Sequence, residues 1–138
     1  MNTIKITLFF LAFTLIGCSD TNEDATDKLE TTGILGRWEI NNRSYNGLAP
    51  LTVVCCEFIE FSVDKNKNDL SGVYTFSSEQ TSSTGTFTLD DSNETIALQS
   101  DQDETVYDFV LSASQQAFIL SYTAQDDTLV SENWVATK

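Results

Sequence analysis

From about residue 33 onwards, the sequence alternates between apolar and polar side chains in short runs, and this pattern restricts the fold more than any other feature. Phe87 and Leu89 alternate with Thr86 and Thr88, and Tyr107, Phe109 and Leu111 share one face. Successive side chains of a strand point to opposite faces, so the pattern is typical of an antiparallel sheet with one buried face. We therefore expect an all-β domain with strands at 36–45, 53–63, 70–78, 84–90, 93–100, 105–113, 117–124 and 129–137.

Turn-forming residues separate these runs at short intervals. The clearest clusters are Asn46-Gly47, residues 65–68 and residues 90–93, where Asn, Asp, Gly and Ser favour tight connections. Short strands at regular spacing indicate a sandwich or a barrel. Consecutive tight connections favour an up-and-down meander, and closing that meander into a barrel removes the exposed sheet edges. The sequence thus predicts an antiparallel up-and-down barrel of about eight strands.

The chain begins with the features of an export signal. Lys5 supplies a positive charge, and an apolar run of about 11 residues follows, which is shorter than the roughly 20 residues that cross a bilayer as a helix. The run ends in Leu15-Ile16-Gly17-Cys18, which resembles the lipobox of bacterial lipoproteins. The resemblance implies that residues 1–17 are a lipoprotein signal peptide and that a lipid attached to Cys18 anchors the mature protein to a membrane.

Residues 18–32 are polar and acidic, and they carry few large apolar groups. Such a stretch buries too little surface to offset the entropy lost on ordering, so we expect a flexible tether there. Within it, residues 19–24 resemble the acidic export signal that sends Bacteroidota lipoproteins to the cell surface. This implies an outer-membrane protein on the cell surface, with the periplasmic face as the alternative.

Two tryptophans frame the β region. Gly36-Arg37-Trp38 opens the first expected strand, and Trp134 lies in the last one. Between them, residues 72–76 and 85–89 both begin with glycine and continue as alternating strands. This order is similar to that of the small lipocalin-like domains of Bacteroidota lipoproteins, whose first strand opens with Gly-x-Trp. The resemblance covers residues 33–138 and implies a calycin-type barrel that binds a small molecule.

Composition excludes several classes of function. The formal net charge of -14 and the lack of any Lys/Arg cluster argue against nucleic-acid binding. The chain has no histidine, the commonest general base and the commonest zinc ligand. Neither a phosphate-binding loop nor a Gly-x-Ser-x-Gly motif occurs. We therefore expect no enzymatic activity, no catalytic residues, no cofactor and no metal site.

Cys55 and Cys56 remain once Cys18 has taken the lipid. Adjacent Cα atoms lie about 3.8 Å apart, whereas disulfides usually need about 4.4 Å or more. We expect two thiols, at least one of them buried. One alternative is a vicinal disulfide in a distorted turn, which the oxidising cell envelope would favour. The others are metal binding and intermolecular pairing.

Aromatic side chains dominate the faces expected to point inward, and they either fill the barrel or line an apolar cup open at one end. In the second case, tyrosine hydroxyls need polar partners, and we take Trp38, Tyr74, Tyr107 and Tyr122 as candidate ligand-lining residues. The full set of inward candidates is Trp38, Phe61, Tyr74, Phe76, Phe87, Tyr107, Phe109, Phe118, Tyr122 and Trp134.

Glu57 stands out because strict alternation places it on the apolar face of Ile59 and Phe61. We expect a β-bulge near Cys56 to turn Glu57 outward, since bulges re-aim side chains. The alternative is an inward Glu57, which would be a further candidate for the ligand site because buried carboxylates are common at functional sites.

Two functions fit these expectations. In the first, a lipid-anchored lipoprotein binds a small apolar or amphipathic molecule in its barrel. In the second, a filled barrel docks a partner of the cell envelope through its outer face. A cavity lined by tyrosines would favour the first, and a solid interior with an exposed apolar patch would favour the second.

Overall fold

The computed structural model describes residues 27–137, so the predicted signal peptide, Cys18 and residues 18–26 of the predicted tether lie outside the described part. No helix within residues 27–137 is long and apolar enough to cross a membrane. The elements of the described part, in chain order, are the 3-10 helix η1 (Lys28–Thr31) and the strands β1 (Gly36–Tyr45), β2 (Leu51–Thr52), β3 (Phe58–Val63), β4 (Ser71–Ser77), β5 (Ser82–Asp90), β6 (Thr95–Gln99), β7 (Glu104–Leu111), β8 (Ala117–Thr123) and β9 (Leu129–Ala136).

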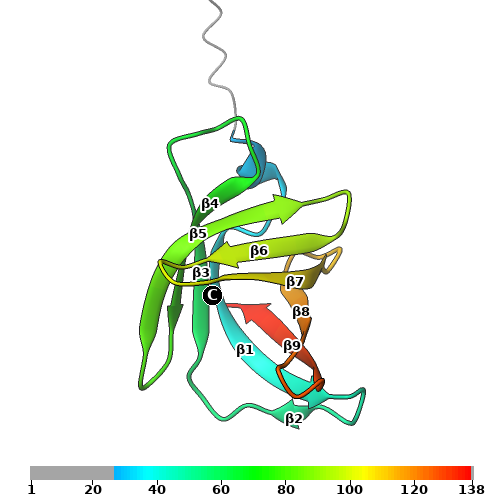
Figure 1. Ribbon diagram of the computed structural model, residues 1–138. Coiled ribbons are helices and arrows are strands. Elements are labelled where there is room, and N and C mark those ends of the chain that lie inside the picture. The colour runs from blue at the N-terminus through cyan, green and yellow to red at the C-terminus, as the bar shows by residue number, and fades with distance from the viewer. Residues whose placement is uncertain (1–26, 138) are drawn as a thin grey trace, which may run out of the picture.

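The strands form a closed barrel (Figure 1). From β3 to β9 each strand pairs with the next along the chain, and β1 pairs with both β3 and β9, which closes the sheet. Every pairing is antiparallel, with Trp38 opposite Ile59 on one side of β1 and Ile40 opposite Trp134 on the other. The predicted all-β, up-and-down antiparallel barrel of about eight strands is therefore confirmed, and its architecture is consistent with a lipocalin-like barrel.

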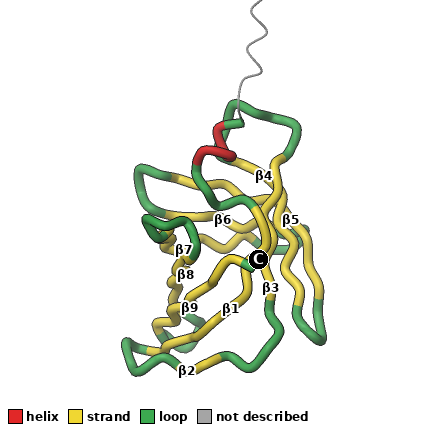
Figure 2. Tube along the Cα trace, turned by 180° about the vertical axis from the view of Figure 1, so that it is seen from behind, coloured by secondary structure: helices red, strands yellow, loops and turns green. Residues whose placement is uncertain are grey.

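The predicted strand at 53–63 is wrong over its first half. Residues 53–57 are irregular, and β3 begins only at Phe58. An extra two-residue strand, β2, comes before them and pairs with the far end of β1, where Asn42 lies opposite Thr52. The chain therefore makes a wide excursion at the end of the barrel where β2 lies, below the body of the barrel in Figures 1 and 2.

The predicted tether is also too long at its C-terminal end. The Asp27 carboxylate accepts a hydrogen bond of 2.9 Å from the backbone N–H of Leu29, which caps η1. Leu29 and Ile34 are completely buried in the core. Residues 27–32 thus belong to the folded unit, and within the described residues the predicted start of the domain moves from residue 33 to Asp27, because the buried Leu29 fixes this acidic stretch to the barrel.

The core fills the end of the barrel that carries η1. Phe118 lies at its centre, with its ring centroid 4.9 Å from that of Trp38, 6.0 Å from that of Phe61 and 5.6 Å from that of Phe109. The indole N–H of Trp38 donates a 2.8 Å hydrogen bond to the Ile34 carbonyl, which ties the segment after η1 to β1. These contacts join η1, the segment after it and the strands into one hydrophobic cluster.

Candidate functional site

The other end of the barrel is hollow. A half-enclosed cavity of about 370 Å³ lies there, within the range of roughly 300–1,000 Å³ that small-molecule sites occupy. In an up-and-down barrel, the C-terminal ends of β1, β4, β6 and β8 meet the N-terminal ends of their neighbours at one rim, and the cavity is built from these ends. Its walls combine apolar and polar side chains: Ile59, Phe76, Leu98, Leu120 and Trp134 are apolar, whereas Arg43, Glu57, Tyr74, Ser83, Ser100, Asp103, Thr105, Tyr107, Tyr122 and Glu132 are polar.

Arg43 and two glutamates form an ion-paired cluster in the cavity wall. Arg43 on β1 lies directly opposite Glu132 on β9. Its Nε and Nη2 lie 2.8 and 2.7 Å from Glu132 Oε1, and Nη2 also lies 3.0 Å from Glu57 Oε2. Burial alone would lower the pKa of Arg43, but the charges and hydrogen bonds of Glu132 and Glu57 outweigh it and raise that pKa. Arg43 is therefore a permanent cation held by two carboxylates.

Glu132 is the most buried member of this cluster, with 9% of its side chain exposed. Besides Arg43, it accepts a 3.2 Å hydrogen bond from the indole N–H of Trp134 and a long one, 3.5 Å, from the Tyr122 hydroxyl. Glu132 thus links the charged wall of the cavity to an aromatic wall, and it fixes the orientation of both.

The aromatic wall consists mainly of tyrosines. The rings of Tyr107 and Tyr122 meet edge to face, with their centroids 5.3 Å apart. The third tyrosine, Tyr74, lies on β4. Burial raises the pKa of all three phenols, and for Tyr122 burial together with the negative charge of Glu132 raises the pKa to about 12. The three hydroxyls therefore stay protonated at neutral pH, so each can donate a hydrogen bond and accept one.

The structure brings four of the five candidate ligand-lining residues to this cavity and leaves one out. Glu57, Tyr74, Tyr107 and Tyr122 lie on its wall. Trp38 does not, because its indole is buried among the core side chains at the η1 end, with 2% of the residue exposed.

The expectation that a bulge turns Glu57 outward is wrong. The chain is irregular up to Glu57, and the side chain faces the cavity because it pairs with Arg43.

Sequence reasoning missed Arg43 and Glu132. Glu132 shares the inward face of its strand with the buried Val130 and Trp134, so the reasoning applied to Glu57 would have found it. Arg43 could not be found in this way. Strict alternation from Trp38 and Ile40 puts it outside, but a register shift between Ile40 and Asn42 turns it inward.

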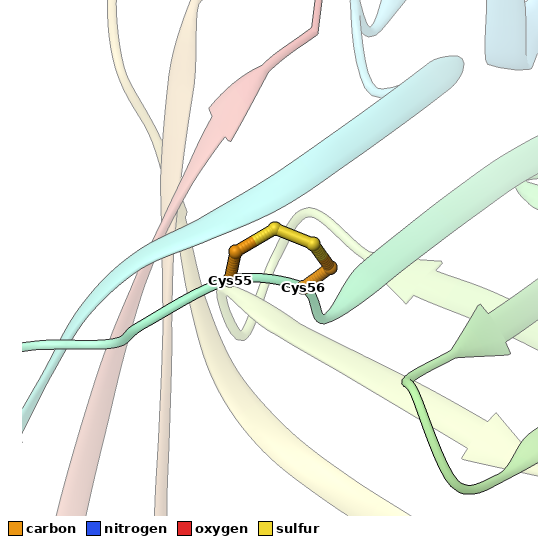
Figure 3. The surroundings of a disulfide bond; sticks show 2 residues. All are labelled: Cys55 and Cys56. Carbon is orange, nitrogen blue, oxygen red and sulfur yellow. A yellow bond between two sulfur atoms is a disulfide. The ribbon is translucent and has the colours of Figure 1, made fainter.

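Cys55 and Cys56 are joined in a vicinal disulfide (Figure 3). The expectation of two thiols is therefore wrong, and the alternative pairing is the one observed. The disulfide lies in the irregular segment before β3 and alongside β1, immediately before Glu57. With Glu57 and residues 78–81 of the β4–β5 turn it lines a second hollow of about 310 Å³ at the same end of the barrel.

Comparison with protein-family models and with curated proteins gives no match. Within the described residues, no group of three or more Cys, Asp or Glu side chains is placed to hold a metal ion. The geometry of the cavity therefore carries the functional argument.

Proposed function

We propose that this protein is an exported, membrane-anchored lipoprotein whose small lipocalin-like barrel binds a small amphipathic molecule. The observation that supports it most is the half-enclosed cavity at one end of the barrel, whose wall combines aliphatic and aromatic side chains with charged and hydroxyl groups. Concave, largely preformed sites of this size with convergent polar groups are typical of small-molecule binding. The Leu15-Ile16-Gly17-Cys18 motif and the acidic residues after it support anchoring through Cys18 at the surface of the outer membrane.

The alternative function, docking of a cell-envelope partner by a filled barrel, has less support. Exposed aliphatic side chains do occur on the outer face, where Val110 on β7 lies opposite Ile119 on β8 and the two are 55% and 42% exposed. However, a pair of exposed aliphatics is small beside the patches of several hundred Å² that mark interaction sites, and the interior is hollow at one end. The cavity therefore favours the binding function.

A fluorescent probe tests ligand binding directly. The chain from Ser19 onwards lacks the acylation site but keeps the whole described fold, and it can be titrated with the neutral apolar probe N-phenyl-1-naphthylamine. We expect a saturable rise in fluorescence with one site per chain. Leu98→Trp, which fills the cavity, abolishes it. Val106→Trp is the matched control, because Val106 is 57% exposed and lies outside the cavity, and it leaves binding unchanged.

A binding curve that Leu98→Trp does not alter would place the probe elsewhere and overturn the ligand-binding proposal. Anchoring is tested separately by expressing the full chain and Cys18→Ser in the native host. We expect the full chain in the membrane fraction with added acyl mass, and the variant without that mass. Digestion by protease added to whole cells distinguishes the cell surface from the periplasmic face.

A further inference from the structure

We propose that the cavity selects an organic cation, a small amine or quaternary ammonium compound with an apolar or aromatic body. This inference rests on the proposed ligand-binding function and narrows the ligand to one charge class. It is drawn from the balance of charge in the cavity wall, the aromatic faces beside it and an unused hydroxyl.

Negative charge exceeds positive charge in the wall. Glu57, Asp103 and Glu132 contribute carboxylates, whereas Arg43 is the only cationic side chain among the described residues that line the cavity. Arg43 already donates to both glutamates through Nε and Nη2, so two carboxylates offset its single positive charge. The formal net charge of -14 extends the same negative potential over the whole molecule, and such a field raises the local concentration of cations.

Glu57 is the carboxylate best placed for a ligand. Its side chain is 27% exposed, compared with 9% for Glu132, and its single ion pair uses one carboxylate oxygen, Oε2. Asp103 lies in the turn between β6 and β7, at the rim of the barrel. A cation that entered past Asp103 would therefore meet Glu57 on the wall without first breaking the Arg43–Glu132 pair.

The aromatic side chains supply a second attraction for a cation. The cavity wall includes Tyr74, Tyr107, Tyr122 and Trp134, and the faces of such rings attract ammonium groups. Tyr74 is only 6% exposed, yet none of the hydrogen bonds found within residues 27–137 involves its hydroxyl. Its hydroxyl is not among the buried polar atoms that lack a partner in this part of the chain, so it is accessible from the cavity, and it can accept a hydrogen bond from the N–H of a bound ammonium ion.

Three probes of matched size and different charge test this inference. Calorimetry at neutral pH on the chain from Ser19 onwards would compare the 2-phenylethylammonium ion, neutral 2-phenylethanol and anionic 3-phenylpropionate. We expect the dissociation constant of the cation to be about tenfold lower than that of the alcohol, from cation–π and charge attraction together. The anion binds most weakly of the three.

Two variants with the same change of charge locate the effect. Asp103→Asn removes a carboxylate at the rim, outside the Arg43 cluster, and it lowers the preference for the cation over the alcohol. Asp108→Asn is the matched control, because Asp108 is exposed on β7 between Tyr107 and Phe109. This substitution leaves the preference for the cation unchanged. Glu57→Gln reduces the preference further than Asp103→Asn, and circular dichroism shows whether its barrel remains folded.

The outcomes separate this inference from the proposed function. Two results would refute the charge selection and leave the ligand-binding function standing. One is equal binding of the cation and the alcohol, and the other is tightest binding of 3-phenylpropionate. If none of the three binds, and the neutral fluorescent probe also fails, the ligand-binding function itself is overturned.

Discussion

The two tryptophans offer a matched test of the claim that one end of the barrel is packed and the other is open to solvent. Both are 2% exposed, and each donates an indole hydrogen bond, Trp38 to the carbonyl of Ile34 and Trp134 to the carboxylate of Glu132. Replacing either with phenylalanine removes a similar volume, which costs about 1 kcal/mol at the usual rate for core cavities. The remainder of the cost depends on the acceptor left behind.

The two acceptors differ in their other partners. Ile34 is completely buried, so Trp38→Phe leaves its carbonyl without a donor, which adds about 1–3 kcal/mol. Glu132 keeps its bonds from Arg43 on Oε1 and lies on a cavity that water can enter, so water can replace the indole at Oε2 and Trp134→Phe adds little. We expect Trp38→Phe to lower the free energy of unfolding by about 2–4 kcal/mol and Trp134→Phe by about 1–2 kcal/mol.

Urea unfolding followed by far-ultraviolet circular dichroism measures both losses, because this signal does not depend on tryptophan fluorescence. An equal loss in the two variants, or a larger one for Trp134→Phe, would refute the division into a packed end and an open end. If the free energy of unfolding of one variant falls with urea at a different slope, the compactness of its folded or unfolded state has changed, and its loss of stability cannot be compared with that of the other variant.

Three further predictions concern the pH dependence and the packing of the barrel. The pKa of Tyr122 is raised to about 12 from 10.0, so the folded state binds the phenol proton more tightly than the unfolded state. The stability that this proton contributes is complete below pH 10 and is lost as the pH rises to about 12. Tyr122→Phe therefore makes urea midpoints less sensitive to pH in that window. Leu29→Ala lowers the free energy of unfolding by about 2–4 kcal/mol in urea titrations, because Leu29 is completely buried, whereas a residue in a flexible tether would cost nothing. Gly85→Ala lowers the melting temperature, since the added Cβ would collide with the Gln99 carbonyl on β6, and an unchanged melting temperature would contradict the close approach of the two strands.

The barrel could be predicted from the sequence because its strands carry their own signal. Period-2 alternation identifies the buried face locally: Phe118, Leu120 and Tyr122 share one face of their strand, and Ser121 lies on the other. The turn residues between strands indicate the order of the meander. Seven of the eight predicted strands accordingly lie within about two residues of the observed ones at each end. The same alternation predicts the three tyrosines on the inner face, whereas it gives the inward Glu57 only as the alternative to a bulge.

The features that could not be predicted are those that break the local pattern. Arg43 reaches the cavity only because a bulge after Ile40 reverses its face, and a bulge of this kind leaves no mark in the alternation. The core position of Leu29 depends on contacts with distant strands, so nothing in its acidic surroundings reveals it. The pairing of Cys55 with Cys56 likewise depends on the irregular segment before β3, where a regular strand was expected.

The central claim is that the open end of the barrel holds a small molecule, and mass spectrometry of the protein isolated from its own cells tests it most directly. The chain would be weighed first under native and then under denaturing conditions, with Leu98→Trp isolated in parallel. We predict an added mass in the native spectrum of the unaltered protein that disappears on denaturation and is missing from the variant. A native mass equal to the denatured mass, repeated after exposure to a total lipid and metabolite extract, would contradict the claim.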